Sequence, residues 1–142
     1  MVNAQMNSLM PDLNRWSCVA MCNDQTNFFV SGTSSLNPSM GVLFAVFEST
    51  VPIKIVTAIK VPKVQIASKV QRIKGTDVYL VACDSDIMVA QFSHQTKKLE
   101  LINKIKSLGD TGIQDFCFRK YYCYVLMQNS NKLMILNFKP GR

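Results

Sequence analysis

Three short apolar segments that end in phenylalanine recur along this chain at nearly equal spacing. They span residues 41–47 (GVLFAVF), 86–92 (DIMVAQF) and 132–138 (KLMILNF), and their closing phenylalanines lie 45 and 46 residues apart. A period of this length, filled only with strand-like and turn-like segments, is typical of repeated four-stranded β units. The spacing therefore predicts an all-β repeat protein.

The repeat divides the chain into four predicted parts. Residues 1–14 are polar, contain a helix-breaking Pro11 and are expected to form an N-terminal arm. Three units of strands are expected to follow, at about 15–62, 63–108 and 109–142. The third unit stops before a fourth strand.

The second and third strands of each unit are near-continuous apolar runs. Such runs are expected where a strand is covered on both faces, as when sheets pack against neighbouring sheets. Residues 97–106, in which Leu99, Ile102 and Ile105 are separated by polar and charged residues, also fit a short amphipathic helix. The repeat favours a strand there. The alternative fold is a compact β-sandwich or a single α+β domain, which would accommodate the helix.

Two of the repeated segments, 86–92 and 132–138, resemble the third strand of a WD-type blade, and most of the chain resembles about three such blades. Where that family has its Trp-Asp pair, the chain has Ala90-Gln91 and Leu136-Asn137, and the family's Gly-His pair is absent from each unit. The resemblance implies a degenerate WD-repeat-like β-propeller, here a partial one of about three four-stranded blades. It also implies a non-enzymatic platform that binds other proteins.

The five cysteines are an odd number and cannot all pair within one chain. They are Cys18, Cys22, Cys83, Cys117 and Cys123. Their strand-like surroundings favour free, buried thiols in a reducing compartment, so an intracellular location, cytoplasmic or nuclear, is expected. Their spacing does not match the close ligand pairs of zinc sites, and no metal or cofactor is expected. No apolar stretch approaches the length of about 18 residues that a transmembrane helix requires.

Few residues suggest catalysis. His94 is the only histidine and occupies a polar turn, where a solvated loop residue is expected. Asp84 and Asp86 form a close carboxylate pair, but Asp and Ser are common in tight turns between strands. No phosphate-binding glycine motif or zinc-protease motif occurs. The chain is therefore expected not to be an enzyme.

The positive charge is unevenly distributed. The chain has sixteen Lys and Arg against nine Asp and Glu, a net charge of +7, and fifteen of the sixteen cationic residues follow residue 50. In a propeller blade, the loops after the first and third strands emerge on one face. That face would gather the predicted partner-binding residues Lys74, His94, Lys97, Lys98, Arg119 and Lys120. The opposite face would receive Asp84, Asp86 and Asp110.

The leading functional hypothesis is a protein-interaction scaffold that docks within a larger assembly. Three blades do not close, since known propellers use roughly 4–8, so other chains are expected to complete or flank the open sides, as homo- or hetero-oligomer. The alternative is a binder of an acidic protein surface or of nucleic acid through the basic loop face. Tyr121 and Tyr122 beside the basic pair at 119–120 could stack on bases, although the strand position of Tyr122 favours the core.

Overall fold

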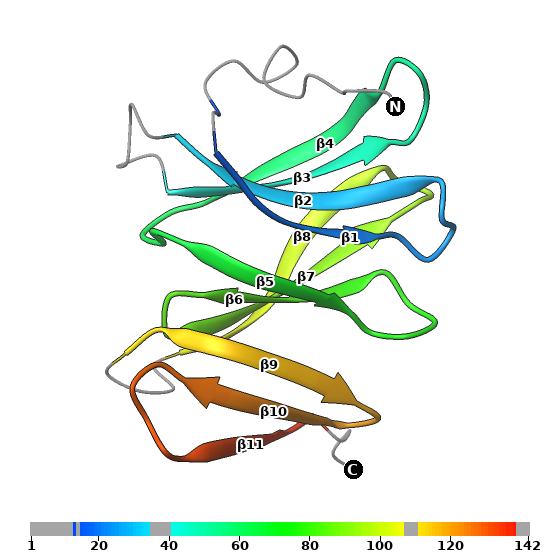
Figure 1. The fold of residues 1–142 in the computed structure, drawn as a ribbon. Coiled ribbons are helices and arrows are strands. Elements are labelled where there is room, and N and C mark those ends of the chain that lie inside the picture. Colours follow the sequence, from blue (N-terminus) through cyan, green and yellow to red (C-terminus); the bar gives the residue numbers. More distant parts are fainter. Residues whose placement is uncertain (1–12, 14, 35–40, 107–110, 139–142) are drawn as a thin grey trace.

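The computed structural model describes residues 13, 15–34, 41–106 and 111–138 (Figure 1). This part of the chain forms eleven β-strands and contains no helix. The strands make three antiparallel sheets of four, four and three strands, which confirms the all-β prediction. Except for Leu13, the predicted arm lies outside the described residues, as do the loop 35–40 and Asp110.

Within each sheet the strands lie side by side in chain order. The first sheet contains β1 (Arg15–Met21), β2 (Asn27–Thr33), β3 (Val42–Glu48) and β4 (Lys54–Val61). The second contains β5 (Ala67–Arg72), β6 (Val78–Cys83), β7 (Asp86–Ser93) and β8 (Lys98–Ile105). The third contains β9 (Ile113–Arg119), β10 (Tyr122–Met127) and β11 (Leu133–Asn137). The three repeated segments thus correspond to β3, β7 and β11, the third strand of each sheet.

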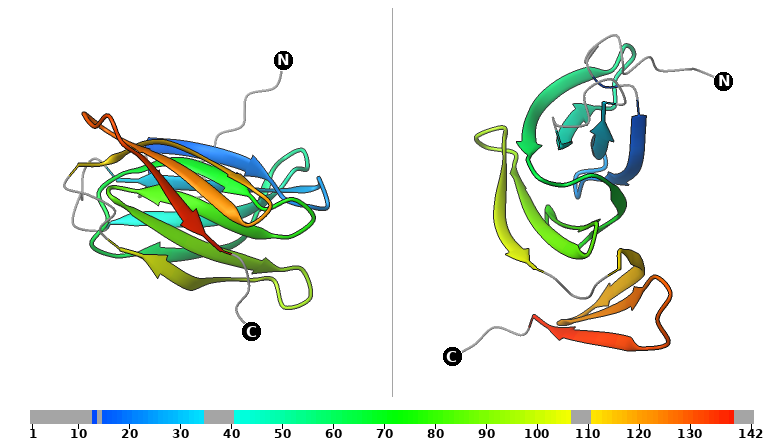
Figure 2. Two further views of the ribbon diagram at one scale, coloured as in Figure 1. Left: turned by 90° about the horizontal axis from the view of Figure 1, so that it is seen from below. Right: turned by 90° about the vertical axis from the view of Figure 1, so that its left-hand side faces the viewer.

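The sheets are stacked with the second between the other two, as the views in Figures 1 and 2 show. Their first strands, β1, β5 and β9, lie next to one another along the stack. No sheet curls round to pair its own edge strands. The stack therefore has two outer faces, one on the first sheet and one on the third.

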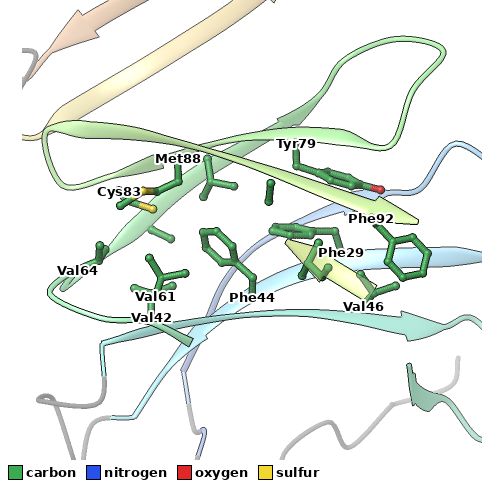
Figure 3. Packing of buried hydrophobic residues seen from close by; sticks show 14 of the residues in the cluster. Phe29, Val42, Phe44, Val46, Val61, Val64, Tyr79, Cys83, Met88 and Phe92 are labelled. Carbon is green, nitrogen blue, oxygen red and sulfur yellow. The ribbon is translucent and has the colours of Figure 1, made fainter. Parts of the chain in front are cut away.

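The core between the first and second sheets contains stacked aromatic rings among aliphatic side chains (Figure 3). The rings of Phe29 and Tyr79 stack at a centroid distance of 4.6 Å, and Phe44 packs against Phe29 at 5.2 Å. All three side chains are fully buried. Each large apolar side chain buried in this way contributes roughly 1.5–3 kcal/mol.

Alternate residues of β6 serve two different cores. Tyr79 and Val81 pack toward the first sheet, whereas Leu80 and Ala82 pack with the third sheet. Successive side chains of a strand point to opposite faces, so a strand between two sheets must be apolar at every position. This confirms the sequence prediction of strands covered on both faces for the second sheet.

The same prediction is wrong for the third sheet. In β10, Cys123, Val125 and Met127 are buried, but the alternating positions are exposed or half-buried. Leu133 and Ile135 of β11 are exposed as well. Only one face of this sheet packs on a neighbour among the described residues, so half of its apolar side chains remain uncovered.

The helical interpretation of residues 97–106 is also wrong. This segment is β8, which pairs with β7 in antiparallel register with Leu99 opposite Phe92. Leu99 is buried in the core between the first two sheets. The α+β alternative fails in the described residues for the same reason, and the three stacked sheets also differ from the two layers of a β-sandwich. The described chain holds no helix of the length and apolarity needed to cross a membrane.

Candidate functional site

Three of the six predicted partner-binding residues line one groove. Lys74 lies in the turn between β5 and β6, and Arg119 and Lys120 lie at the turn between β9 and β10. The groove between these turns has a volume of about 390 Å³. Its complete lining is Gln71, Arg72, Ile73, Lys74, Phe118, Arg119 and Lys120. We call this set the basic groove.

A side-chain amide joins the two walls of the basic groove. Gln71 Nε2 donates to the backbone carbonyl of Phe118 at 3.0 Å, and the Phe118 N–H donates to Gln71 Oε1 at 2.8 Å. The amide therefore satisfies one backbone donor and one backbone acceptor of β9, as a paired strand would. Sequence analysis did not single out Gln71, because a polar residue in a strand is usually solvated.

Arg72 ties the same region to the first sheet. Its Nε donates to the carbonyl of Met21 at 3.0 Å, and its guanidinium also donates to Asn23 Oδ1 at 3.2 Å and to the Thr76 carbonyl at 3.0 Å. These acceptors are neutral. Among the described residues Arg72 has no carboxylate partner, so its charge is fixed in place but not neutralised.

Lys69 is the cation next to the groove that is neutralised. Its Nζ lies 2.6 Å from Asp115 Oδ1 and 2.6 Å from the Phe116 carbonyl, and it sits 5.4 Å from the centroid of the Phe116 ring. The hydrogen bond from Lys69 lowers the pKa of Asp115, and the partly opposing effect of burial is smaller. Lys69 and Asp115 thus form a second connection between the second and third sheets.

The other three predicted residues lie in or beside the turn between β7 and β8. Lys97 and Lys98 are exposed there and do not line the basic groove. His94 is half-buried, and its ring packs edge-on against Phe92 at 4.8 Å. The sequence expectation of a solvated histidine is therefore wrong, because this turn folds back onto the ends of other strands.

His94 bridges two carboxylates from different sheets. Its Nε2 lies 2.6 Å from Asp77 Oδ2, and its Nδ1 lies 3.2 Å from Asp24 Oδ2. Burial opposes ionisation of Asp24, but the N–H groups of Thr26 and Asn27 and the charge of His94 outweigh it and lower the pKa of this carboxyl. The cluster connects the β1–β2 turn of the first sheet to the second sheet.

The thiol nearest this cluster is not poised for nucleophilic chemistry. Cys22 is fully buried, and burial raises its pKa to about 11. A thiol with so high a pKa is protonated at neutral pH and reacts slowly. In the part of the chain that the structure describes, no group of three His, Cys, Asp or Glu side chains is placed to hold a metal ion.

The acidic residues predicted for the opposite face have structural roles. Asp84 adopts a positive φ of 54° in the β6–β7 turn, and its carboxylate accepts hydrogen bonds from the N–H groups of Gln65 and Ile66 at 3.0 and 3.1 Å. Asp86 lies 3.8 Å from the ammonium of Lys104. The turn therefore anchors the connection between the first two sheets. It lies at the far end of β6 from Lys74, whereas Asp77 lies at the same end as Lys74.

The outward face of the third sheet is a surface that the sequence prediction missed. We call it the outer apolar face, and it is formed by Cys117, Tyr122, Tyr124, Leu126, Leu133 and Ile135, whose pairing places them on one side of β9, β10 and β11. Asp115, Arg119 and Asn137 border these residues on the same side. Tyr122, expected in the core, is 40% exposed. Because both faces of β10 carry apolar residues, period-two alternation gave no sign of which face would stay open.

No protein-family model matches the chain, and no curated protein is similar to it at a significant level.

Proposed function

We propose that the chain is a non-enzymatic protein-interaction scaffold, a segment of a WD-like β-propeller that docks within a larger assembly. The outer apolar face is the docking surface, and its occupant is a β-sheet of another protein chain. The free state of the cysteines among the described residues supports an intracellular location for this assembly.

The observation that carries the proposal is a comparison of equivalent positions in the second and third sheets. Leu133 and Ile135 of β11 follow Ile87 and Val89 of β7 by one repeat of 46 residues. The earlier pair is buried by the third sheet, with exposed fractions of 0% and 7%, whereas Leu133 and Ile135 are 55% and 58% exposed. The same apolar pattern is thus buried by a neighbouring sheet in β7 and exposed in β11.

The cover on the earlier pair identifies the chemistry of the missing partner. Ile87 and Val89 are buried in one cluster with Phe116 and Val125, which are paired on one face of the antiparallel third sheet. Equivalent surfaces take equivalent partners, so the outer apolar face suits the apolar face of another sheet. Contiguous exposed apolar surface of this kind marks interaction sites in proteins.

The chemistry of the described residues supports a binding role over an enzymatic one. The single histidine is engaged by Asp24 and Asp77, and the nearest thiol, Cys22, has a raised pKa. A nucleophilic site would require a base within hydrogen-bonding distance of an accessible nucleophile.

The test compares the chain with a variant whose outer apolar face is polar. Leu133→Ser combined with Ile135→Ser removes two side chains of the face that are 55% and 58% exposed. The matched control, Val19→Ser combined with Ile102→Ser, alters two apolar residues of β1 and β8 that are 63% and 48% exposed. Binding of a hydrophobic fluorescent dye and mass by analytical ultracentrifugation are measured for each protein. We expect dye binding or self-association that the face variant loses and the control retains.

A dispersed monomer without dye binding would contradict the proposal, since a closed surface needs no partner. Self-association that is lost only in the face variant would identify the partner as a second copy of this chain. Equal loss in the face variant and the control would show that general surface apolarity, and not this face, causes the association.

A further inference from the structure

The basic groove is a second recognition surface, which adjoins the outer apolar face at Arg119 and extends from there to the turn between β5 and β6. Its lining contains the four cationic residues Arg72, Lys74, Arg119 and Lys120 and no acidic residue. We infer that this groove binds a short acidic peptide segment of another protein. This function goes beyond the scaffold role proposed above and does not depend on it.

The walls of the basic groove are fixed before any ligand arrives. The two hydrogen bonds between Gln71 and Phe118 hold β5 and β9 together at its floor. The guanidinium of Arg72 is held by the carbonyls of Met21 and Thr76. A ligand therefore meets a preformed backbone and a fixed Arg72, and the exposed side chains of Lys74, Arg119 and Lys120 are what remains to be ordered on binding.

None of the four cations that line the groove has a carboxylate partner among the described residues. Lys69 and Lys104, on the same sheet, are each paired with a carboxylate. Lys74, Arg119 and Lys120 form no ion pair with any residue that the structure describes. Clustered like charges without counter-charges create a positive potential that attracts anionic ligands and strengthens their hydrogen bonds.

The surroundings of the groove favour a short carboxylate ligand over nucleic acid. Arg72 contacts Asn23 and the Thr76 carbonyl, which are next in the chain to the carboxylates of Asp24 and Asp77, and Asp115 lies on β9 with Arg119. A long polyanion would have to pass these carboxylates, whereas a short segment would not. Ile73 and Phe118 in the lining also offer apolar contacts to a peptide side chain.

The backbone conformation at Lys120 allows a substitution that removes its charge without straining the turn. Lys120 has a φ of +56°, a conformation in which glycine is less strained than lysine, so Lys120→Gly removes a charge without opposing the turn. Lys63 has nearly the same φ of +64° in an exposed loop remote from the groove, and Lys63→Gly is the matched control.

The test measures fluorescence anisotropy of two labelled probes with the full chain. One probe is a short peptide of glutamates around a central leucine, and the other is a single-stranded oligothymidine long enough to extend past both ends of the groove. The groove variant combines Lys74→Ala, Arg119→Ala and Lys120→Gly. The control variant combines Lys54→Ala, Lys60→Ala and Lys63→Gly, which remove the same number of exposed charges from the region of β4.

We expect saturable peptide binding that weakens as salt rises, and about a tenfold loss of affinity in the groove variant against less than about twofold in the control. If the groove variant does not fold, the single change Lys120→Gly is expected to weaken binding about threefold and Lys63→Gly to leave it unchanged. Absence of saturable peptide binding would overturn the inference. So would equal losses in the two variants, or tighter binding of oligothymidine than of the peptide.

Discussion

The side-chain amide of Gln71 and the backbone of Phe118 are joined by two reciprocal hydrogen bonds of 3.0 and 2.8 Å. The two residues are 47 positions apart and belong to different sheets. The Gln71 side chain therefore makes a donor and an acceptor hydrogen bond to the neighbouring sheet, as a backbone partner does within a sheet. Together with the Lys69–Asp115 pair and the shared core, this contact positions the third sheet on the second, and it forms the floor of the basic groove.

Gln71→Ala is expected to destabilise the chain by about 1–3 kcal/mol, because it leaves a half-buried N–H and carbonyl of Phe118 without partners. Urea unfolding measures the change. Gln114→Ala, an exposed glutamine on β9, is the control and should cost far less. Equal effects of the two substitutions would show that the bridge between the sheets contributes nothing.

Tyr79 provides a test of the core between the first two sheets. Tyr79→Phe removes only the hydroxyl that donates to Asp77 Oδ1 at 3.1 Å and is expected to cost about 1 kcal/mol. Tyr79→Ala also removes the ring stacked on Phe29 and is expected to cost about 3–5 kcal/mol. Thermal and urea unfolding would report both. Similar costs for the two variants would be inconsistent with a fully buried ring.

Cysteine reactivity should distinguish Cys117 from the other thiols. Burial raises the pKa of Cys18, Cys22, Cys83 and Cys123, for Cys22 and Cys123 to about 11. Cys117 is exposed on the outer apolar face. Iodoacetamide at neutral pH should therefore modify Cys117 first in the native chain, and mass spectrometry of peptides identifies the site. Cys117→Ser should abolish this fast reaction, and rapid labelling of Cys22 instead would contradict the described core.

The lowered pKa of Asp24 predicts an acid-dependent contribution to stability. The native carboxyl binds its proton less readily than the unfolded one, whose pKa is near 3.8. The stabilisation is thus present above that value and is lost as pH falls through the lower native pKa. Urea unfolding at a series of pH values measures the difference in unfolding free energy between wild type and Asp24→Asn. This difference should be largest at about pH 6 and shrink toward about pH 3. A difference that grows on acidification would have the wrong sign.

The sequence predicted the strands because their spacing and apolarity are local properties. Phe47 and Phe92, which defined the repeat, are both buried, as repeated core positions should be. The neighbours of each face are not local properties. Nothing in the run from Tyr122 to Met127 distinguishes the side that meets the second sheet from the side that meets none.

The candidate site was predictable to a similar extent. Blade geometry placed Lys74, Arg119 and Lys120 at one end of the sheets, and the structure brings these three into one groove. His94 was assigned to solvent because its partner Asp24 lies far away in the sequence and becomes its neighbour only when the first two sheets stack. Contacts between sheets depend on stacking geometry that strand patterns do not encode.

The two ends of the stack of sheets differ in how well their strands are covered. The first sheet rests on the second, the second is enclosed, and β11 is the edge strand of the third sheet, with its outward side chains exposed and its inward ones half-buried. Local opening should therefore begin at β11 and move toward the first sheet, and amide hydrogen exchange should be fastest at that end. Removal of the third sheet would uncover Leu80, Ile87 and Val89, a surface much like the one already open. The second and third sheets thus each present a similar apolar face on which a further sheet can pack.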